Sequence, residues 1–132
     1  MAYVSLDSDQ IKKAHKKHKY TKEQVEQLEK CMDEKTGPLF FMKTFMKIQH
    51  PTKGEMAFVP YPYQERLVEA YNNHRFSISM LPRQTGKTTC ASGYLIWYAM
   101  FKPDSQILIA AHKYAGASDI MSRVRYAYEM LP

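Results

Sequence analysis

The sequence predicts an α/β fold, in which helices cover a parallel sheet, from the pattern of its second half. Apolar runs at residues 76–80 and 106–111 have the length and composition of buried strands. Apolar residues recur at helical spacing in 64–71, 87–101 and 116–131. Strands that alternate with helices in this way form parallel sheets with right-handed crossovers.

This parallel sheet is expected to be incomplete. Two strands cannot bury both faces and pair both edges of such a sheet. Pro132 falls at the end of the last predicted helix, where another strand would follow after a short loop. We therefore expect the chain to be the N-terminal portion of a larger protein.

The first half of the chain predicts a helical extension before the sheet. Thr21 and Gln24 form a capping-box signature, and the helix that they open stops at Gly37. A second helix is expected over residues 38–48, with a proline in its first turn and an aromatic stripe. A short strand is expected at 56–59. The predicted organisation is a leader, a helical segment and a partial α/β domain, with bounds 1–20, 21–55 and 56–132.

The charge of the chain favours contact with a polyanion. The 132 residues carry a net charge of +6 and a pI near 9.3, which is compatible with binding DNA. Five lysines and two histidines are concentrated in residues 12–19. This basic leader is interpreted as a solvated, flexible segment, with a contact to the phosphate backbone of DNA as the alternative.

Cysteine spacing and hydropathy indicate whether the protein is metal-binding, disulfide-bonded, secreted or membrane-embedded. Cys31 and Cys90 lack the spacing of a zinc site or a disulfide framework. The amino terminus has no signal-peptide pattern, and no apolar run approaches the roughly 18 residues of a membrane span. We expect a soluble, unsecreted protein without a membrane partner.

Residues 81–89, Leu-Pro-Arg-Gln-Thr-Gly-Lys-Thr-Thr, match most of the Walker A pattern G-x-x-x-x-G-K-[ST], and they lie between a predicted strand and a predicted helix. Leu81 replaces the first glycine of the pattern. In such a loop, backbone N–H groups and a helix N-terminus face the phosphates, the lysine reaches the β and γ oxygens, and the hydroxyl ligates Mg²⁺. The sequence therefore predicts an incomplete P-loop NTPase sheet that binds ATP and Mg²⁺, with Lys87 and Thr88 in these roles.

Three further residues are candidates for the same site. Arg83 could stabilise charge on the γ-phosphate, and a structural or DNA-facing role is the alternative. Gln64 could bond the adenine edge while Tyr63 packs on the base; otherwise Tyr63 belongs to the core and Gln64 caps a helix. Thr89 could also contact the nucleotide, and the alternative for this residue is a contact on the face of the helix. The predicted nucleotide-binding set is Tyr63, Gln64, Arg83, Gln84, Thr85, Gly86, Lys87, Thr88 and Thr89, with Arg83 and Lys87 also catalytic and Thr88 the metal ligand.

The chain lacks a recognisable acidic motif for hydrolysis. A Walker B strand is a short apolar run that ends in Asp-Glu and holds Mg²⁺. The only such pair, Asp33-Glu34, lies in the predicted N-terminal helical segment and has neither the position nor the pattern. No carboxylate cluster suits a two-metal nuclease. The role of His112-Lys113, which follow the second predicted strand, stays open.

Several segments together resemble the large terminase subunit of T4-like tailed phages. They are Tyr-Gln-Glu-Arg at 63–66, the loop at 81–89, Ile-Leu-Ile-Ala-Ala-His-Lys at 107–113, and Tyr-Glu-Met-Leu-Pro at 128–132. The Walker A loop of that family commonly reads x-x-Arg-Gln-x-Gly-Lys-Thr-Thr, frequently without the first glycine. The resemblance covers roughly residues 21–132 and is most specific in the loop.

The resemblance implies an ATP-driven motor that packages double-stranded viral DNA into a prohead, with a C-terminal nuclease. Tyr63 and Gln64 would contact adenine, Arg83 would be the loop arginine, and residues 86–88 would hold phosphate and Mg²⁺. The implied partners are viral DNA, the portal protein, the small terminase subunit and, if the gene is split, a downstream C-terminal terminase chain. The implied location is the cytoplasm of the infected bacterium, transiently at the prohead portal.

Two other interpretations remain. A fragment of a superfamily 2 helicase-like ATPase would also combine an upstream glutamine with a Gln-x-Gly-Lys-Thr loop, and motifs further along would discriminate. A non-enzymatic partner protein would keep the P-loop only as a remnant and act by assembly with a separate chain. Whether the chain is itself an enzyme is left open by the missing acidic residue.

Overall fold

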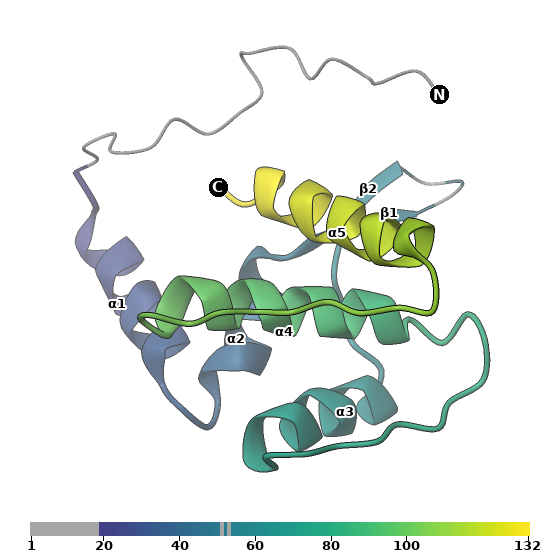
Figure 1. Cartoon of the computed structure of the whole chain (residues 1–132). Coiled ribbons are helices and arrows are strands. Elements are labelled where there is room, and N and C mark those ends of the chain that lie inside the picture. Colours follow the sequence, from purple (N-terminus) through teal and green to yellow (C-terminus); the bar gives the residue numbers. More distant parts are fainter. Residues whose placement is uncertain (1–18, 51, 53) are drawn as a thin grey trace.

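The computed structural model describes residues 19–50, 52 and 54–132. Within these ranges the protein is mostly helical, with five helices and one small antiparallel hairpin. The helices are α1 (Lys22–Met32), α2 (Gly37–Phe45), α3 (Pro62–Asn73), α4 (Lys87–Phe101) and α5 (Tyr114–Glu129), and the hairpin is β1 (Lys47–His50) with β2 (Gly54–Ala57). Figure 1 shows α4 in the middle of the helices.

The prediction of a parallel sheet, and with it an incomplete P-loop NTPase sheet, is wrong for the described residues. Segments 76–80 and 106–111, the two predicted strands, are irregular connections without a ladder partner. Phe76, Ile78 and Met80 are 82%, 94% and 93% exposed. An apolar run forms a strand only where a neighbouring strand accepts its hydrogen bonds, and no such neighbour is present among the described residues.

The helix predictions are largely confirmed. Helix α1 begins with the predicted capping box, in which Gln24 N–H donates to Thr21 Oγ1 at 3.3 Å and Thr21 N–H donates to Gln24 Oε1 at 2.9 Å. It ends at Met32, before the expected stop at Gly37. Helix α4 has the predicted bounds, and α5 is shifted by two residues toward the N-terminus. Capping and periodicity depend on neighbouring residues, so the helix predictions hold even though the predicted parallel sheet is absent from the described residues.

The second predicted helix is too long. We expected it to run over 38–48, but α2 ends at Phe45 and Met46 is extended. Residues 47–50 instead pair with 54–57, where we expected only one short strand at 56–59. Gly54 adopts the left-handed conformation that the reversal requires, with φ of +71°. The pairing of residues 47–50 with 54–57 therefore overrides the helical pattern of residues 46–48.

Trp97 of α4 is the centre of the buried core. Its side chain is fully buried, and Nε1 donates to the carbonyl of Cys31 at 2.7 Å. This bond satisfies one of the last carbonyls of α1, which have no partner within the helix. Because α2, α3 and α5 all contact α4, that helix is apolar on most sides. The core therefore joins the predicted segments 21–55 and 56–132 in one cluster.

Both cysteines lie in this core as free thiols. Desolvation raises the pKa of Cys31 and of Cys90 to about 11, so both thiols stay protonated at neutral pH. Among the described residues, no group of His, Cys, Asp and Glu side chains is arranged to hold a metal ion.

The basic leader predicted at 12–19 lies, except for Lys19, outside the described residues, as does most of the predicted segment 1–20. Among the helices that the structure describes, none has the length and apolar character needed to cross a bilayer.

Candidate phosphate-binding loop

The loop at 81–86 leads directly into α4, and two of its residues have left-handed backbone conformations. Gln84 has φ of +62° and Gly86, the N-cap of α4, has φ of +75°. Left-handed residues within a loop turn successive N–H groups toward one concave side, which suits anions. No side chain caps the N-terminus of α4, so its first N–H groups and its dipole face the loop unopposed.

Two side chains close the loop from within. Lys87 Nζ donates to the carbonyl of Leu81 at 2.9 Å, which brings the ammonium back across the loop. Thr85 Oγ1 donates to the carbonyl of Pro82 at 3.0 Å. The lysine thus needs only a backbone carbonyl at the start of the loop, and Leu81 supplies this as well as a glycine would.

Tyr63 and Gln64 of α3 hold the loop from outside. The carbonyl of Thr85 accepts hydrogen bonds from Tyr63 Oη at 2.9 Å and from Gln64 Nε2 at 3.1 Å. Gln64 is buried, and its Oε1 accepts from Tyr61 N–H at 2.9 Å at the start of α3. The alternative role foreseen for Gln64, a helix cap, is therefore present, and the same amide also fixes the loop.

The close approach of Gln64 explains the glycine at position 86. A Cβ atom on Gly86 would lie 2.6 Å from Gln64 Nε2, inside the contact distance of real atoms. The positive φ disfavours any side chain at this position as well. A glycine at position 86 therefore suits the left-handed backbone and leaves room for the Gln64 amide that anchors Thr85.

Tyr61 was missed by sequence reasoning. Its ring stacks on that of Tyr63 with centroids 5.8 Å apart and an interplanar angle of 7°, and it is mostly exposed. The Pro60-Tyr61-Pro62 segment carries a signal, because prolines on both sides restrict the backbone of the tyrosine between them. The pair forms an aromatic surface beside the loop.

The remaining candidates differ in position. Arg83 is exposed and forms no hydrogen bond or ion pair with another described residue, so it is available to a ligand. Thr88 is half-buried in the first turn of α4. Thr89 lines a separate cleft between α4, α5 and the hairpin. His112 and Lys113 are exposed, and Lys113 is the N-cap of α5.

Asp33 and Glu34 have structural roles, in agreement with their exclusion as a Walker B pair. Asp33 Oδ1 accepts hydrogen bonds from the N–H groups of Lys35 and Thr36, and the bond from Thr36 N–H is the main cause that lowers the pKa of Asp33. Glu34 pairs with Lys102 at 2.9 Å, which lowers the pKa of Glu34.

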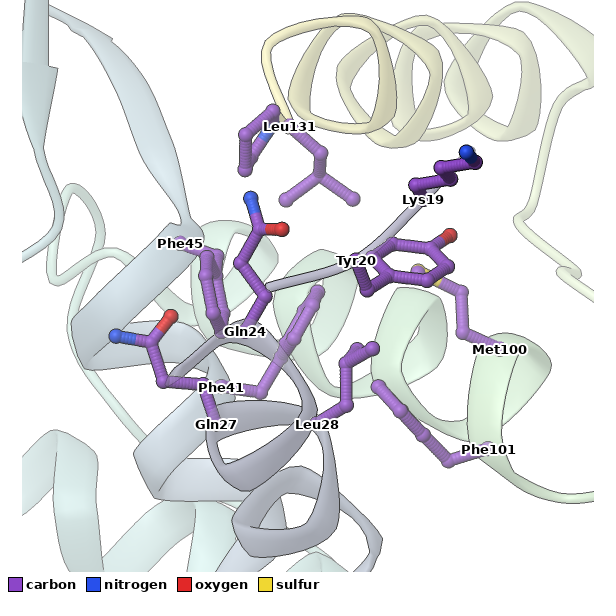
Figure 2. Close-up of a pocket in the computed structure, with 11 residues that line it drawn as sticks. Lys19, Tyr20, Gln24, Gln27, Leu28, Phe41, Phe45, Met100, Phe101 and Leu131 are labelled. Carbon is purple, nitrogen blue, oxygen red and sulfur yellow. The ribbon is translucent and has the colours of Figure 1, made fainter. Parts of the chain in front are cut away.

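An apolar cavity of about 330 Å³ lies at the opposite end of α4 from the loop. Figure 2 shows Phe41, Phe45 and Leu28 around it, with Met100 and Phe101 from the last turn of α4. A helix of 15 residues is about 22 Å long, so this cavity is remote from Lys87. Its lining is mostly apolar, with Lys19, Gln24 and Gln27 as polar members.

No protein-family model matches this sequence.

Proposed function

We propose that residues 81–88 bind the phosphates of ATP with Mg²⁺. The observation that supports this most strongly is the loop backbone, with left-handed Gln84 and Gly86 before an uncapped helix and the Lys87 ammonium bonded to the Leu81 carbonyl at the start of the loop. Donors and a cation that converge in this way favour an anion.

The proposal assigns a role to each residue of the loop. The backbone N–H groups of 84–88 receive the phosphates, and Lys87 exchanges the Leu81 carbonyl for a β- or γ-phosphate oxygen. Thr88 ligates Mg²⁺, and exposed Arg83 neutralises charge on the γ-phosphate. Thr89, which faces the other cleft, supports the helix instead of the nucleotide.

Adenine recognition is proposed at Tyr63 and Gln64. Gln64 Oε1 and one Nε2 hydrogen are engaged by Tyr61 and Thr85, so the second Nε2 hydrogen is the group left for the adenine edge. Tyr63 is stacked on Tyr61, and this pair offers the aromatic surface for the base.

Binding of a fluorescent N-methylanthraniloyl-ATP in the presence of MgCl₂ tests the proposal. Lys87→Ala should raise the Kd at least tenfold, which is about 1.4 kcal/mol. Lys102→Ala is the matched control, because Lys102 caps the other end of the same helix and pairs with Glu34. Equal affinity of the wild-type and Lys87→Ala proteins would refute the phosphate site.

The biological role that we propose is ATP binding in a DNA-packaging motor, as the N-terminal part of a terminase large subunit. This role rests on the sequence resemblance. The proposed partners are double-stranded viral DNA, the portal protein, the small terminase subunit and a downstream C-terminal chain. The proposed location is the host cytoplasm, transiently at the prohead portal. We expect no ATP turnover above that of Lys87→Ala, because the 132 residues contain no Walker B pair. Turnover should appear when the downstream polypeptide is added, and its absence in that mixture would argue against a split gene.

A second candidate function, a non-enzymatic assembly partner with a remnant loop, is favoured by the exposed apolar residues Phe76, Ile78 and Met80. Several exposed apolar residues in one short segment mark a surface that another molecule covers. If the isolated chain and the Lys87→Ala variant assemble equally well with the downstream polypeptide without ATP, this function replaces the first.

A further inference from the structure

A polar cleft of about 500 Å³ lies between the hairpin and α5, and none of the loop residues 81–86 lines it. We name it the β1 cleft. Its lining comes from three elements: residues 46–49 on the β1 side, Thr89 and Ser92 of α4, and Asp119, Ser122, Arg123, Tyr126 and Ala127 of α5. Figure 1 shows the hairpin beside α5. Four consecutive residues of an extended segment cannot all face a cleft with their side chains, so the backbone edge of β1 itself lines it.

The hydrogen-bond pattern of the hairpin shows which backbone groups of β1 face outward. Phe58 N–H donates to the Met46 carbonyl at 2.9 Å, and the register continues with Ile48 opposite Met56. Bonded and non-bonded pairs alternate in an antiparallel ladder, so Ile48 faces β2 while Lys47 and Gln49 point their N–H and C=O groups away from it.

This outward edge of β1 is unpaired. The sheet has only two strands in the described residues, and no backbone hydrogen bond joins Lys47 or Gln49 to any described segment beyond β2. A strand edge with free donors and acceptors is a template for another extended chain. Recognition by strand addition uses these backbone groups for affinity and the adjacent side chains for selectivity.

Ser92 gives the cleft a second unsatisfied group. The residue is 1% exposed, and its Oγ has no hydrogen-bond partner among the described residues. A helical serine commonly bonds the carbonyl four residues earlier, and this one does not. A buried hydroxyl without a partner is uncommon in folded proteins, so a polar group of a bound molecule would complete it.

The cleft has two cations, each in an exposed ion pair, that an acidic side chain of an occupant can engage. Lys47 and Arg123 contribute two cations to the lining and Asp119 one carboxylate. Both cations are held only by exposed ion pairs, Lys47 with Glu55 and Arg123 with Asp119. Such pairs contribute little to stability, so a carboxylate from a ligand can replace either partner at small cost.

We propose that the β1 cleft binds an extended peptide segment of another polypeptide, which adds as a strand to the outer edge of β1 and carries an acidic side chain toward Lys47 and Arg123. The backbone of this peptide forms hydrogen bonds with the backbone of Lys47 and Gln49, and one of its polar groups forms a hydrogen bond with Ser92 Oγ. No residue of the proposed phosphate-binding loop lines this cleft, so the peptide proposal can be tested independently of the proposed ATP site.

A displayed library of random linear heptapeptides, selected on the full chain, supplies the probe, and the enriched peptide is then synthesised. Its Kd is measured by titration calorimetry against two variants of one residue. Gln49→Pro removes the outward N–H without touching a bond to β2, a position at which a strand tolerates proline. Gln49→Ala keeps that N–H and is the matched control.

Gln49→Pro should raise the Kd at least tenfold, while Gln49→Ala should change it less than twofold. Bound peptide should slow amide hydrogen exchange at Lys47 and Gln49 and leave that of Ile48 unchanged. Lys87→Ala should bind the peptide as the wild type does. Native fluorescence of Trp97 verifies that each variant is folded.

Three results would overturn the proposal. The first is that no peptide is enriched, and the second is that both Gln49 variants bind equally. The third is a concentration-dependent dimer in sedimentation that Gln49→Pro abolishes and that excludes the peptide, which would assign the edge of β1 to a second copy of this chain.

Discussion

The helical core and the connecting segment between α3 and α4 contain the same kinds of apolar residue but bury them to opposite extents. Ile96, in the middle of α4, is 4% exposed, whereas Ile78 is 94% exposed. Local sequence around both residues is apolar, so composition does not distinguish them. What distinguishes them is whether other elements supply a packing surface. Helices α2, α3 and α5 supply one for α4, whereas Phe76, Ile78 and Met80 are left exposed.

The difference shows where the stability of the described fold resides. Helices satisfy their own backbone groups, so packing one face is enough to stabilise them. An extended segment must find both a hydrogen-bonding neighbour and an apolar surface from elsewhere. The described protein therefore depends on α4 and its contacts, and the extended segments contribute little to its stability.

The largest effect is expected from Trp97→Ala. The substitution empties the centre of the core and leaves the Cys31 carbonyl without its 2.7 Å hydrogen bond. We expect a loss of about 3–5 kcal/mol in the free energy of unfolding. Because Trp97 is the only tryptophan, urea unfolding should be followed by far-UV circular dichroism. A loss in the free energy of unfolding below about 1 kcal/mol would mean that Trp97 is not at the centre of the core.

The matched pair Ile96→Ala and Ile78→Ala tests the comparison directly. The same atoms are removed in both, so only burial differs. We expect about 2–4 kcal/mol for Ile96→Ala and less than about 0.5 kcal/mol for Ile78→Ala. Urea unfolding monitored by Trp97 fluorescence gives both values. If Ile78→Ala cost as much as Ile96→Ala, the extended segment would be packed in solution and the comparison would fail.

Gly86→Ala is expected to have an intermediate effect on stability. The left-handed φ of +75° costs an alanine about 1–2 kcal/mol, and its Cβ would push Gln64 away from Thr85. Gln64→Ala serves as the comparison, because it removes the same anchor without changing the backbone of the loop. Equal stability of the Gly86→Ala and wild-type proteins would mean that the loop relaxes to a different conformation.

The sequence predicted the helices better than the sheet because the two depend on different information. The capping box of Thr21 and Gln24 and the periodicity of α4 are contained in neighbouring residues. A strand depends on a partner that can lie anywhere in the chain, and none pairs with 76–80 among the described residues. Strand β1 was missed although its partner β2 follows it immediately in the chain. The apolar residues of 38–48 have helical spacing, so the pattern predicted a helix there.

The candidate loop could be predicted in outline but not in detail. The Gly-Lys-Thr run located the turn into α4, and Gly86 is indeed left-handed. The bond from Lys87 to Leu81 and the anchoring of Thr85 by α3 are tertiary contacts that spacing does not encode. The β1 cleft was outside the reach of sequence reasoning, because it depends on a hairpin that the pattern did not reveal.

The smallest effect is expected at Asp33, in the exposed turn between α1 and α2. Backbone N–H donors lower the pKa of its carboxyl below the ordinary value of 3.8, with Thr36 the main contributor. A lowered folded-state pKa contributes stability that is present above the unfolded pKa and is lost as the pH falls through the folded value. Asp33→Ala should therefore lower the urea midpoint at pH 7, and the difference from wild type should shrink as the pH falls below about 3.8.

Asp33→Asn separates the charge of this side chain from its geometry. The amide oxygen of Asn can still accept hydrogen bonds from the backbone, but it carries no charge to titrate. Its urea midpoint should lie between those of wild type and Asp33→Ala at pH 7. The gap between Asp33→Asn and Asp33→Ala should stay constant with pH, because neither side chain ionises. If the gap between wild type and Asp33→Ala were equally constant from pH 7 to pH 3, ionisation of the Asp33 carboxyl would contribute nothing to the stability of this turn.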